Sequence, residues 1–184
     1  MGRSLTLLAV SVVLLSVFAH HLGLGPPLVF AGKISLEITD VNLPAKLVAS
    51  ELFTANVIVR WSGFDRNAWT IYDQRGNTIH IQPPVSYGII VSIVPLGSTE
   101  TLSSVTDTNV KTSGSKSYDL MLAAPRSAGP WTLTARVGLR LHMEATNNTL
   151  TIMNQHSKDV TVDVAPATMP SGATELAYDD GTAE

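Results

Sequence analysis

The chain has 184 residues, a formal net charge of −3, 15% charged residues and no cysteine. Without cysteine it can form neither disulfides nor thiolate metal sites, so its core must be stable without such cross-links. The weak net charge and the lack of any Lys/Arg cluster argue against nucleic acid as a partner, because such binding needs a concentrated positive surface.

Residues 1–31 are predicted to be a cleaved export signal, with an uncleaved N-terminal membrane anchor as the alternative. Arg3 precedes an uninterrupted apolar stretch from Leu5 to Ala19, which is short for a bilayer-spanning helix of roughly 20 residues. Small residues that suit signal cleavage lie at Ala19 and Ala31, and a strand-like sequence begins directly after the second. Either interpretation places most of the chain outside the cytoplasm, secreted or at the cell surface.

Residues 32–165 are predicted to form one antiparallel β-sandwich. Apolar and polar residues alternate in short runs, and no helical period of useful length occurs. The first run is Lys33–Thr39. The second, Phe53–Trp61, has the longest apolar face and is expected to be a central strand, with Trp61 closing one end of the core.

Residues 62–84 are expected to form an inserted hairpin that projects from the edge of the sandwich. Two short β-prone runs, Trp69–Tyr72 and Thr78–Ile81, flank a polar turn. Gly76 in that turn can adopt the positive φ that hairpin connections require.

Four side chains of this insert are the predicted ligand contacts: Trp69, Tyr72, Arg66 and Arg75. An aromatic pair beside arginines on a projecting loop can stack on a sugar or anchor a protein partner. The alternative is that the hairpin packs against its own sandwich.

The rest of the domain continues the strand pattern. An apolar run covers Val85–Val94, and the polar stretch Thr101–Lys111 suits an edge strand. Tyr118–Leu122 and Trp131–Val137 are two alternating runs joined by a Pro/Gly-rich corner, and they are expected to be neighbouring strands with Trp131 in the core. A bulge is expected at Gly138.

Two further runs, Thr149–Met153 and Val160–Val164, complete the set. Seven or eight strands in about 135 residues is the number that an immunoglobulin-like sandwich needs.

The segment from Ile34 to Val164 resembles the secreted archaeal and bacterial immunoglobulin-like modules, including the cell-adhesion-related CARDB-type domains. The resemblance is carried by Phe53–Trp61, by Ile89–Pro95, and above all by Tyr118–Pro125 together with Gly129-Pro-Trp131. It implies an immunoglobulin-like antiparallel sandwich in an exported protein.

Residues 166–184 are expected to be a linker and an acidic tail. The tail looks like the opening of a second secreted β-module. Asp179 and Asp180, with Glu175 and Glu184, could supply oxygen ligands to Ca²⁺, or they could form a solvated acidic tail.

Candidate chemistry elsewhere is sparse. His142 and Glu144 lie on one face of a predicted strand, but no third ligand is near in sequence, so a surface pair is expected rather than a metal site. Gly114–Ser117 lacks the spacing of a phosphate loop and is expected to be a hairpin turn. No nucleophile elbow occurs, so neither catalytic residues nor cofactors are predicted. Asn147 begins a single N-glycosylation sequon in an expected turn.

These patterns predict an extracellular structural or adhesion module without catalytic activity. Its partners would be other cell-surface or extracellular proteins, glycans or a second copy of itself, and it would touch a membrane only through residues 1–31 if these stay attached. Two alternatives remain: a carbohydrate-binding accessory module of a secreted multidomain protein, and a surface-filament subunit whose strand Lys33–Asp40 completes a neighbour's sheet.

Overall fold

The computed structural model describes residues 30–108 and 110–167, which form eleven strands and no helix, and so no helix that could cross a membrane. The predicted export signal or anchor lies almost entirely outside the described residues, and so does the acidic tail with its candidate Ca²⁺ ligands. The strands are β1 (Phe30–Lys33), β2 (Ser35–Asn42), β3 (Leu47–Val48), β4 (Leu52–Ser62), β5 (Thr70–Tyr72), β6 (Thr78–His80), β7 (Val85–Pro95), β8 (Ser103–Thr108), β9 (Gly114–Ala123), β10 (Gly129–Met143) and β11 (Asn148–Ala165).

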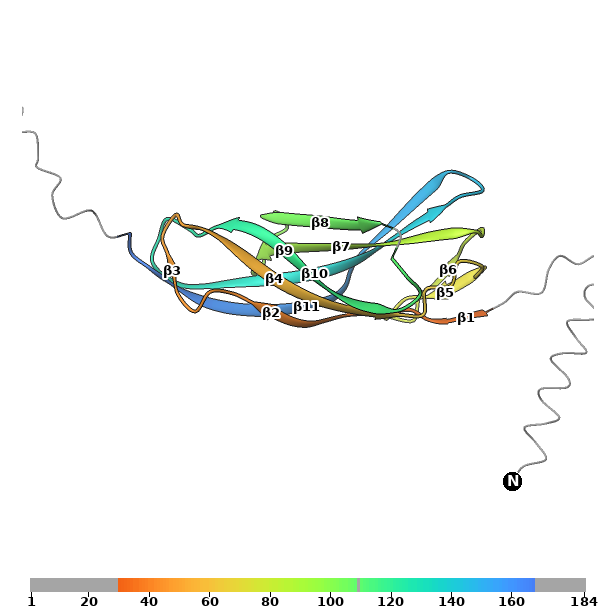
Figure 1. Cartoon of the computed structure of the whole chain (residues 1–184), viewed down its shortest axis with the longest axis horizontal. Coiled ribbons are helices and arrows are strands. Elements are labelled where there is room, and N and C mark those ends of the chain that lie inside the picture. Colours follow the sequence, from red (N-terminus) through yellow and green to blue (C-terminus); the bar gives the residue numbers. More distant parts are fainter. Residues whose placement is uncertain (1–29, 109, 168–184) are drawn as a thin grey trace, which may run out of the picture.

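Two sheets face each other along the length of the molecule (Figure 1). One has the order β2-β4-β9 and the other the order β3-β11-β10-β7-β8. A small third sheet, β1-β5-β6, lies at one end. Pairing is antiparallel except for β1 with β5 and β3 with β11. The predicted all-β class is therefore confirmed, and β8 is the edge strand expected from the polar stretch Thr101–Lys111.

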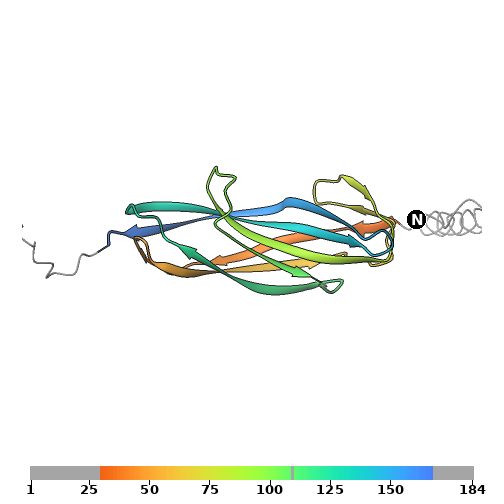
Figure 2. The same cartoon turned by 90° about the horizontal axis from the view of Figure 1, so that it is seen from above.

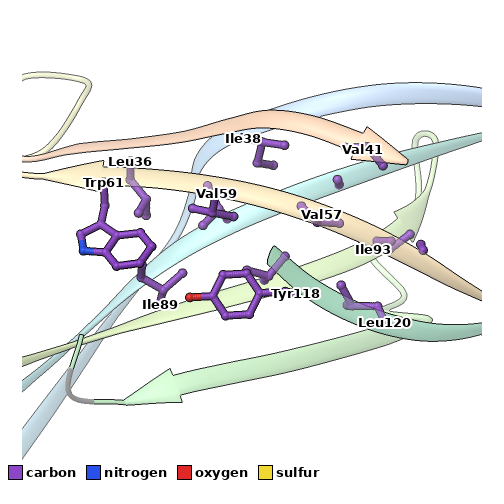
Figure 3. Packing of buried hydrophobic residues seen from close by; sticks show 14 of the residues in the cluster. Leu36, Ile38, Val41, Val57, Val59, Trp61, Ile89, Ile93, Tyr118 and Leu120 are labelled. Carbon is purple, nitrogen blue, oxygen red and sulfur yellow. The ribbon is translucent and has the colours of Figure 1, made fainter. Parts of the chain in front are cut away.

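The core is the apolar layer between these two sheets. Every second residue of β4 and of β10 points into it, and Val57, Val59, Leu139 and Leu141 have no exposed surface. Figure 3 shows side chains from β2, β4, β7 and β9 meeting in this layer. Each fully buried Val, Leu or Ile side chain stabilises the fold by roughly 1.5 to 3 kcal/mol. Trp61 is buried in this layer, but it does not close the end of the core as predicted, because the apolar cluster continues past it through Phe64 and Ile71.

The two runs Tyr118–Leu122 and Trp131–Val137 are not neighbours in one sheet, contrary to the prediction. The first lies in β9, which pairs with β4, whereas the second lies in β10, which pairs with β7 and β11. The Pro/Gly-rich corner carries the chain from one sheet to the other, and alternation alone does not distinguish that crossing from a hairpin. Trp131 is only partly buried and contacts Phe53 edge-to-face, with ring centroids 6.3 Å apart.

The last two predicted runs form the single strand β11, which is interrupted by a bulge. Val137 pairs with His156 and Leu139 with Ile152, so the extra residues lie in β11, opposite Gly138, and not in β10. A side chain at Gly138 would lie 3.0 Å from the carbonyl oxygen of Ile152 and from the sulfur of Met153. Glycine therefore fits this position without displacing the bulge of β11, whereas a larger residue would need its neighbours to move by a few tenths of an ångström.

The predicted turn Gly114–Ser117 is the first part of β9 instead, paired with β4. Lys116 Nζ lies 2.7 Å from Asp107 on β8, and the Tyr118 hydroxyl donates to the same carboxylate at 3.0 Å. Burial and this bond raise the pKa of Tyr118 above its ordinary value. These contacts link the two sheets along the β8–β9 side.

The opposite side of the sandwich is closed by side chains of β11 that reach the free edge of β2. The backbone N–H of Ile38 donates to His156 Nδ1 at 3.2 Å. Lys158 Nζ donates to the carbonyl oxygen of Thr39 at 2.9 Å and lies 3.3 Å from Asp40 Oδ1. Unpaired backbone groups on an edge strand recruit other strands, so these contacts protect β2 from such pairing.

We expect His156→Ala to lower the free energy of unfolding by about 1 to 2 kcal/mol, because it leaves the half-buried Ile38 N–H without an acceptor. Urea unfolding followed by circular dichroism measures this. His142→Ala is the matched control, since within the described residues the one hydrogen bond of its ring is to the exposed Thr149 hydroxyl, and its effect should stay within about 0.5 kcal/mol. Equal effects of the two substitutions would contradict a role of His156 in closing the sandwich.

Candidate functional site

The candidate contact residues all lie at or near one end of the elongated sandwich, which we call the hairpin pole. It comprises β5, β6, the start of β7 and the 144–147 turn between β10 and β11 (Figure 1). β3 and the end of β11 lie at the opposite pole, and Figure 2 shows the same separation from above. The hairpin pole therefore gathers loops that are far apart in sequence.

The predicted hairpin is confirmed, because β5 and β6 pair antiparallel and Gly76 has a φ of 84°. Its inner side chains do not project into solvent. Ala68, Ile71 and Ile81 are buried in the main apolar cluster. The insert thus covers the end of the core instead of standing clear of the sandwich.

Asp73 organises the tip of this hairpin. Its Oδ1 accepts the backbone N–H groups of Arg75 and Asn77, each at 2.9 Å, and its Oδ2 accepts from Asn77 Nδ2 at 2.8 Å. Burial by itself would raise the pKa of this carboxyl, but the bonds from Asn77 and Arg75 outweigh it and hold the pKa below its ordinary 3.8.

Both arginines of the predicted contact set tie the insert to the β10–β11 hairpin. Arg66 Nη2 lies 3.0 Å from Glu144 Oε1, directly after the end of β10. Arg75 Nη2 donates to the carbonyl oxygen of Asn154 in the β11 bulge at 2.9 Å. Trp69 and Tyr72 are half-buried, Trp69 in a groove and Tyr72 on β5 beside β1. Arg66 and Trp69 therefore line different grooves, and each arginine is bonded to a different segment of the β10–β11 hairpin.

The first groove at this pole, the Arg66 groove, has a volume of about 670 Å³. The ring of Tyr87 stacks on Phe64 with centroids 4.7 Å apart, and its hydroxyl donates to the carbonyl oxygen of Asp65 at 2.8 Å. Burial raises the pKa of Tyr87 to about 12, so the phenol stays protonated. The lining residues are Phe64, Asp65, Arg66, Ser86, Tyr87, Val110, Lys111, Thr112 and Glu144.

Ser86 joins His142 and Glu144 in a grouping that the sequence did not reveal. Ser86 lies directly opposite His142 on the neighbouring strand, and its hydroxyl donates to Glu144 Oε1 at 2.7 Å. The bond from Ser86 and the adjacent Arg66 lower the pKa of Glu144.

The connections differ from those of a catalytic triad, in which histidine links serine to the acid. Here His142 Nδ1 is 3.2 Å from the Thr149 hydroxyl, and the serine is bonded to the acid. Within residues 30–108 and 110–167, no three His, Asp or Glu side chains gather closely enough to hold a metal ion. The bonds that Ser86 and Arg66 make to Glu144 link β7, the end of β10 and the insert, and His142 takes no part in them.

The second groove, the Trp69 groove, has a volume of about 500 Å³ and lies between the β5–β6 hairpin and the tip of the β10–β11 hairpin. None of its lining residues is an acid, a lysine or an arginine. They are Trp69, His80, Ile81, Gln82, Met143, Thr146 and Asn148. Trp69 was predicted from sequence. His80 and Gln82 come from the same hairpin, whereas the approach of Thr146 and Asn148 is seen only in the tertiary structure.

No protein-family profile matches the chain, and no curated protein matches its sequence.

Asn147, the predicted glycosylation site, is exposed in the 144–147 turn and has a φ of 54°. Thr149, which completes the sequon, follows at the start of β11. Expression in a host with N-glycosylation should give a glycan mass that endoglycosidase removes and that Asn147→Gln abolishes. Mass spectrometry of the intact protein measures this, and Thr149→Ala should have the same effect. Unmodified wild-type protein from that host would contradict the assignment.

We expect Asp73→Asn to lower the free energy of unfolding by about 1 to 3 kcal/mol at neutral pH, because the amide replaces an acceptor oxygen with a donor. A carboxyl whose pKa is depressed by folding stabilises the folded state above its unfolded pKa. That contribution is lost as the pH falls through the folded pKa, which lies below 3.8. The free energies of unfolding of the wild type and of Asp73→Asn should therefore become equal only in strong acid.

Urea titrations between pH 2 and 7 measure the convergence. Asp163→Asn is the control, because Asp163 is exposed on β11, and this variant should follow the wild type throughout. If the free energies of unfolding of the wild type and of Asp73→Asn differed by the same amount at every pH, this would contradict the role of the carboxylate charge.

Proposed function

We propose that the protein is an exported structural and adhesion module without catalytic activity. One observation carries this proposal: β1 lies at the hairpin pole and β11 ends at the opposite pole (Figures 1 and 2). The 15 residues of β10 alone span about 50 Å at about 3.3 Å per residue. A module whose ends leave from opposite poles acts as a rigid spacer when it is joined in series with other segments.

The strand order supports an immunoglobulin-like sandwich. The order β2-β4-β9 facing β11-β10-β7-β8 resembles the A-B-E and G-F-C-C′ arrangement of such domains. The insert between β4 and β7, the short β3 and the small β1-β5-β6 sheet are additions to that arrangement. A CARDB-type identity remains part of this proposal.

The adhesive part of the proposal rests on the hairpin pole. Loops held by a rigid scaffold are where binding residues concentrate, and this pole has two grooves. β1 begins at Phe30, so cleavage after Ala31 would remove half of its residues, whereas cleavage after Ala19 leaves the strand whole. The proposal therefore favours Ala19 as the cleavage site.

We expect the full chain with a C-terminal epitope tag to be exported from a bacterial host. External protease should remove the tag from intact spheroplasts, and the mass of the exported chain gives the cleavage site. Val12→Arg with Leu14→Arg is the control, because two charges in the apolar stretch should keep the tag inside. A wild-type tag that stays protected would contradict export.

A further inference from the structure

We propose that the Trp69 groove binds a neutral saccharide. This inference rests on the proposed adhesion role and names the class of its partner. The groove lies between two hairpins and is open at the surface, so an end or a side chain of a glycan can enter it. Its volume of about 500 Å³ falls within the range of roughly 300 to 1,000 Å³ that is usual for small-ligand sites.

The lining has the chemistry that a sugar ring requires. A pyranose has an apolar C–H face, which stacks on an indole, and a rim of hydroxyl groups that both donate and accept hydrogen bonds. Trp69 and Met143 supply the apolar contact, and Gln82, Asn148 and Thr146 supply amide and hydroxyl groups.

The absence of formal carboxylate, ammonium and guanidinium groups from the lining selects an uncharged ligand. A charged ligand in this groove would lose hydration without gaining a carboxylate, lysine or arginine partner, and His80 is the one ionisable side chain of the lining. The Arg66 groove differs, because its lining has charged side chains of both signs, with Arg66 paired to Glu144 and Lys111 and Asp65 nearby. It is therefore the weaker of the two candidates for a neutral ligand.

Polar groups of the Trp69 groove are free to bond a ligand. Within the described part of the chain, no side-chain hydrogen bond involves the Trp69 indole N–H, the Gln82 amide or the Asn148 amide. His80 Nδ1 lies 3.3 Å from the Thr70 hydroxyl, which orients the ring and leaves its Nε2 available. Each of these groups can bond a sugar hydroxyl without first breaking a bond inside the protein.

The groove is formed before any ligand arrives. The N–H of Ile81 donates to the carbonyl oxygen of Trp69 at 2.9 Å, which fixes one wall. The N–H of Glu144 donates to the carbonyl oxygen of Pro84 at 3.1 Å, and the Arg66–Glu144 pair joins the two hairpins. Walls that are already in place reduce the conformational entropy lost on binding.

Affinity electrophoresis of the full chain in native gels tests the proposal. The gels contain dextran, a galactomannan, xylan or hydroxyethylcellulose as neutral probes, and alginate as the acidic probe. The protein comes from a bacterial host without N-glycosylation, so that no glycan on Asn147 stands at the rim of the groove. We expect at least one neutral polysaccharide to retard the protein and alginate to leave its mobility unchanged.

Trp69→Ala should weaken the retarding interaction at least roughly tenfold, as truncation of an aromatic anchor does. Trp69 is half-buried, so Gln82→Ala is the second variant, because Gln82 is exposed and its loss leaves the fold intact. Met121→Ala is the control, an exposed side chain on β9 outside the groove. Circular dichroism checks the fold of every variant.

Retardation by a neutral probe that is lost in folded Trp69→Ala or weakened in Gln82→Ala, but kept in Met121→Ala, supports the site. No retardation by any neutral probe would overturn it, as would variants that all behave like the wild type. Retardation by alginate alone would also overturn it. Because the protein is purified, these outcomes do not depend on whether it is exported. A negative result here would therefore rule out saccharide binding in the Trp69 groove without ruling out the exported module, which the tag-accessibility assay tests separately.

Discussion

The apolar layer between the two facing sheets is the constraint on which the rest of the structure depends. It is built from alternate residues of long strands, and many of them, such as Val57, Ile89 and Leu139, have no exposed surface. Because the chain has no cysteine, this layer has to stabilise the domain without disulfides. The apolar layer also holds the hairpin pole in place. Ile71 and Ile81 of the insert are buried in it, and Tyr87 extends it beneath the Arg66 groove.

The sides and the end of the sandwich are closed by polar contacts. His156 and Lys158 satisfy backbone groups on the free edge of β2, and Asp107 links β8 to β9 through Lys116 and Tyr118. At the pole, the two arginines of the insert hold it against β10 and β11. As a consequence, these lysine and arginine side chains bond other parts of the same chain and are not free to bind a partner. Among the described residues, the Trp69 groove, which has no acid, lysine or arginine in its lining, is a surface that keeps free hydrogen-bonding groups.

The geometry of the poles relates the two proposals to each other. The end at which β1 enters the sandwich is also the end that has the grooves, so an anchor at residues 1–31 would direct the Trp69 groove toward the membrane. A cleaved, secreted chain leaves that pole open to partners. The proposed cleavage of the export signal is thus consistent with the proposed binding of a ligand at this pole.

The sequence by itself determined the all-β class, the inward faces of most strands, the β5–β6 hairpin with its glycine turn, and the edge position of β8. These follow from period-2 alternation and from local turn chemistry, which act over a few residues. Only the tertiary structure decided that β9 and β10 lie in opposite sheets, because an alternating strand buries the same face in either arrangement. Likewise, the meeting of Ser86 with Glu144, and of Trp69 with Asn148, depends on strand register and on contacts between segments about 60 to 80 residues apart, which no local pattern specifies.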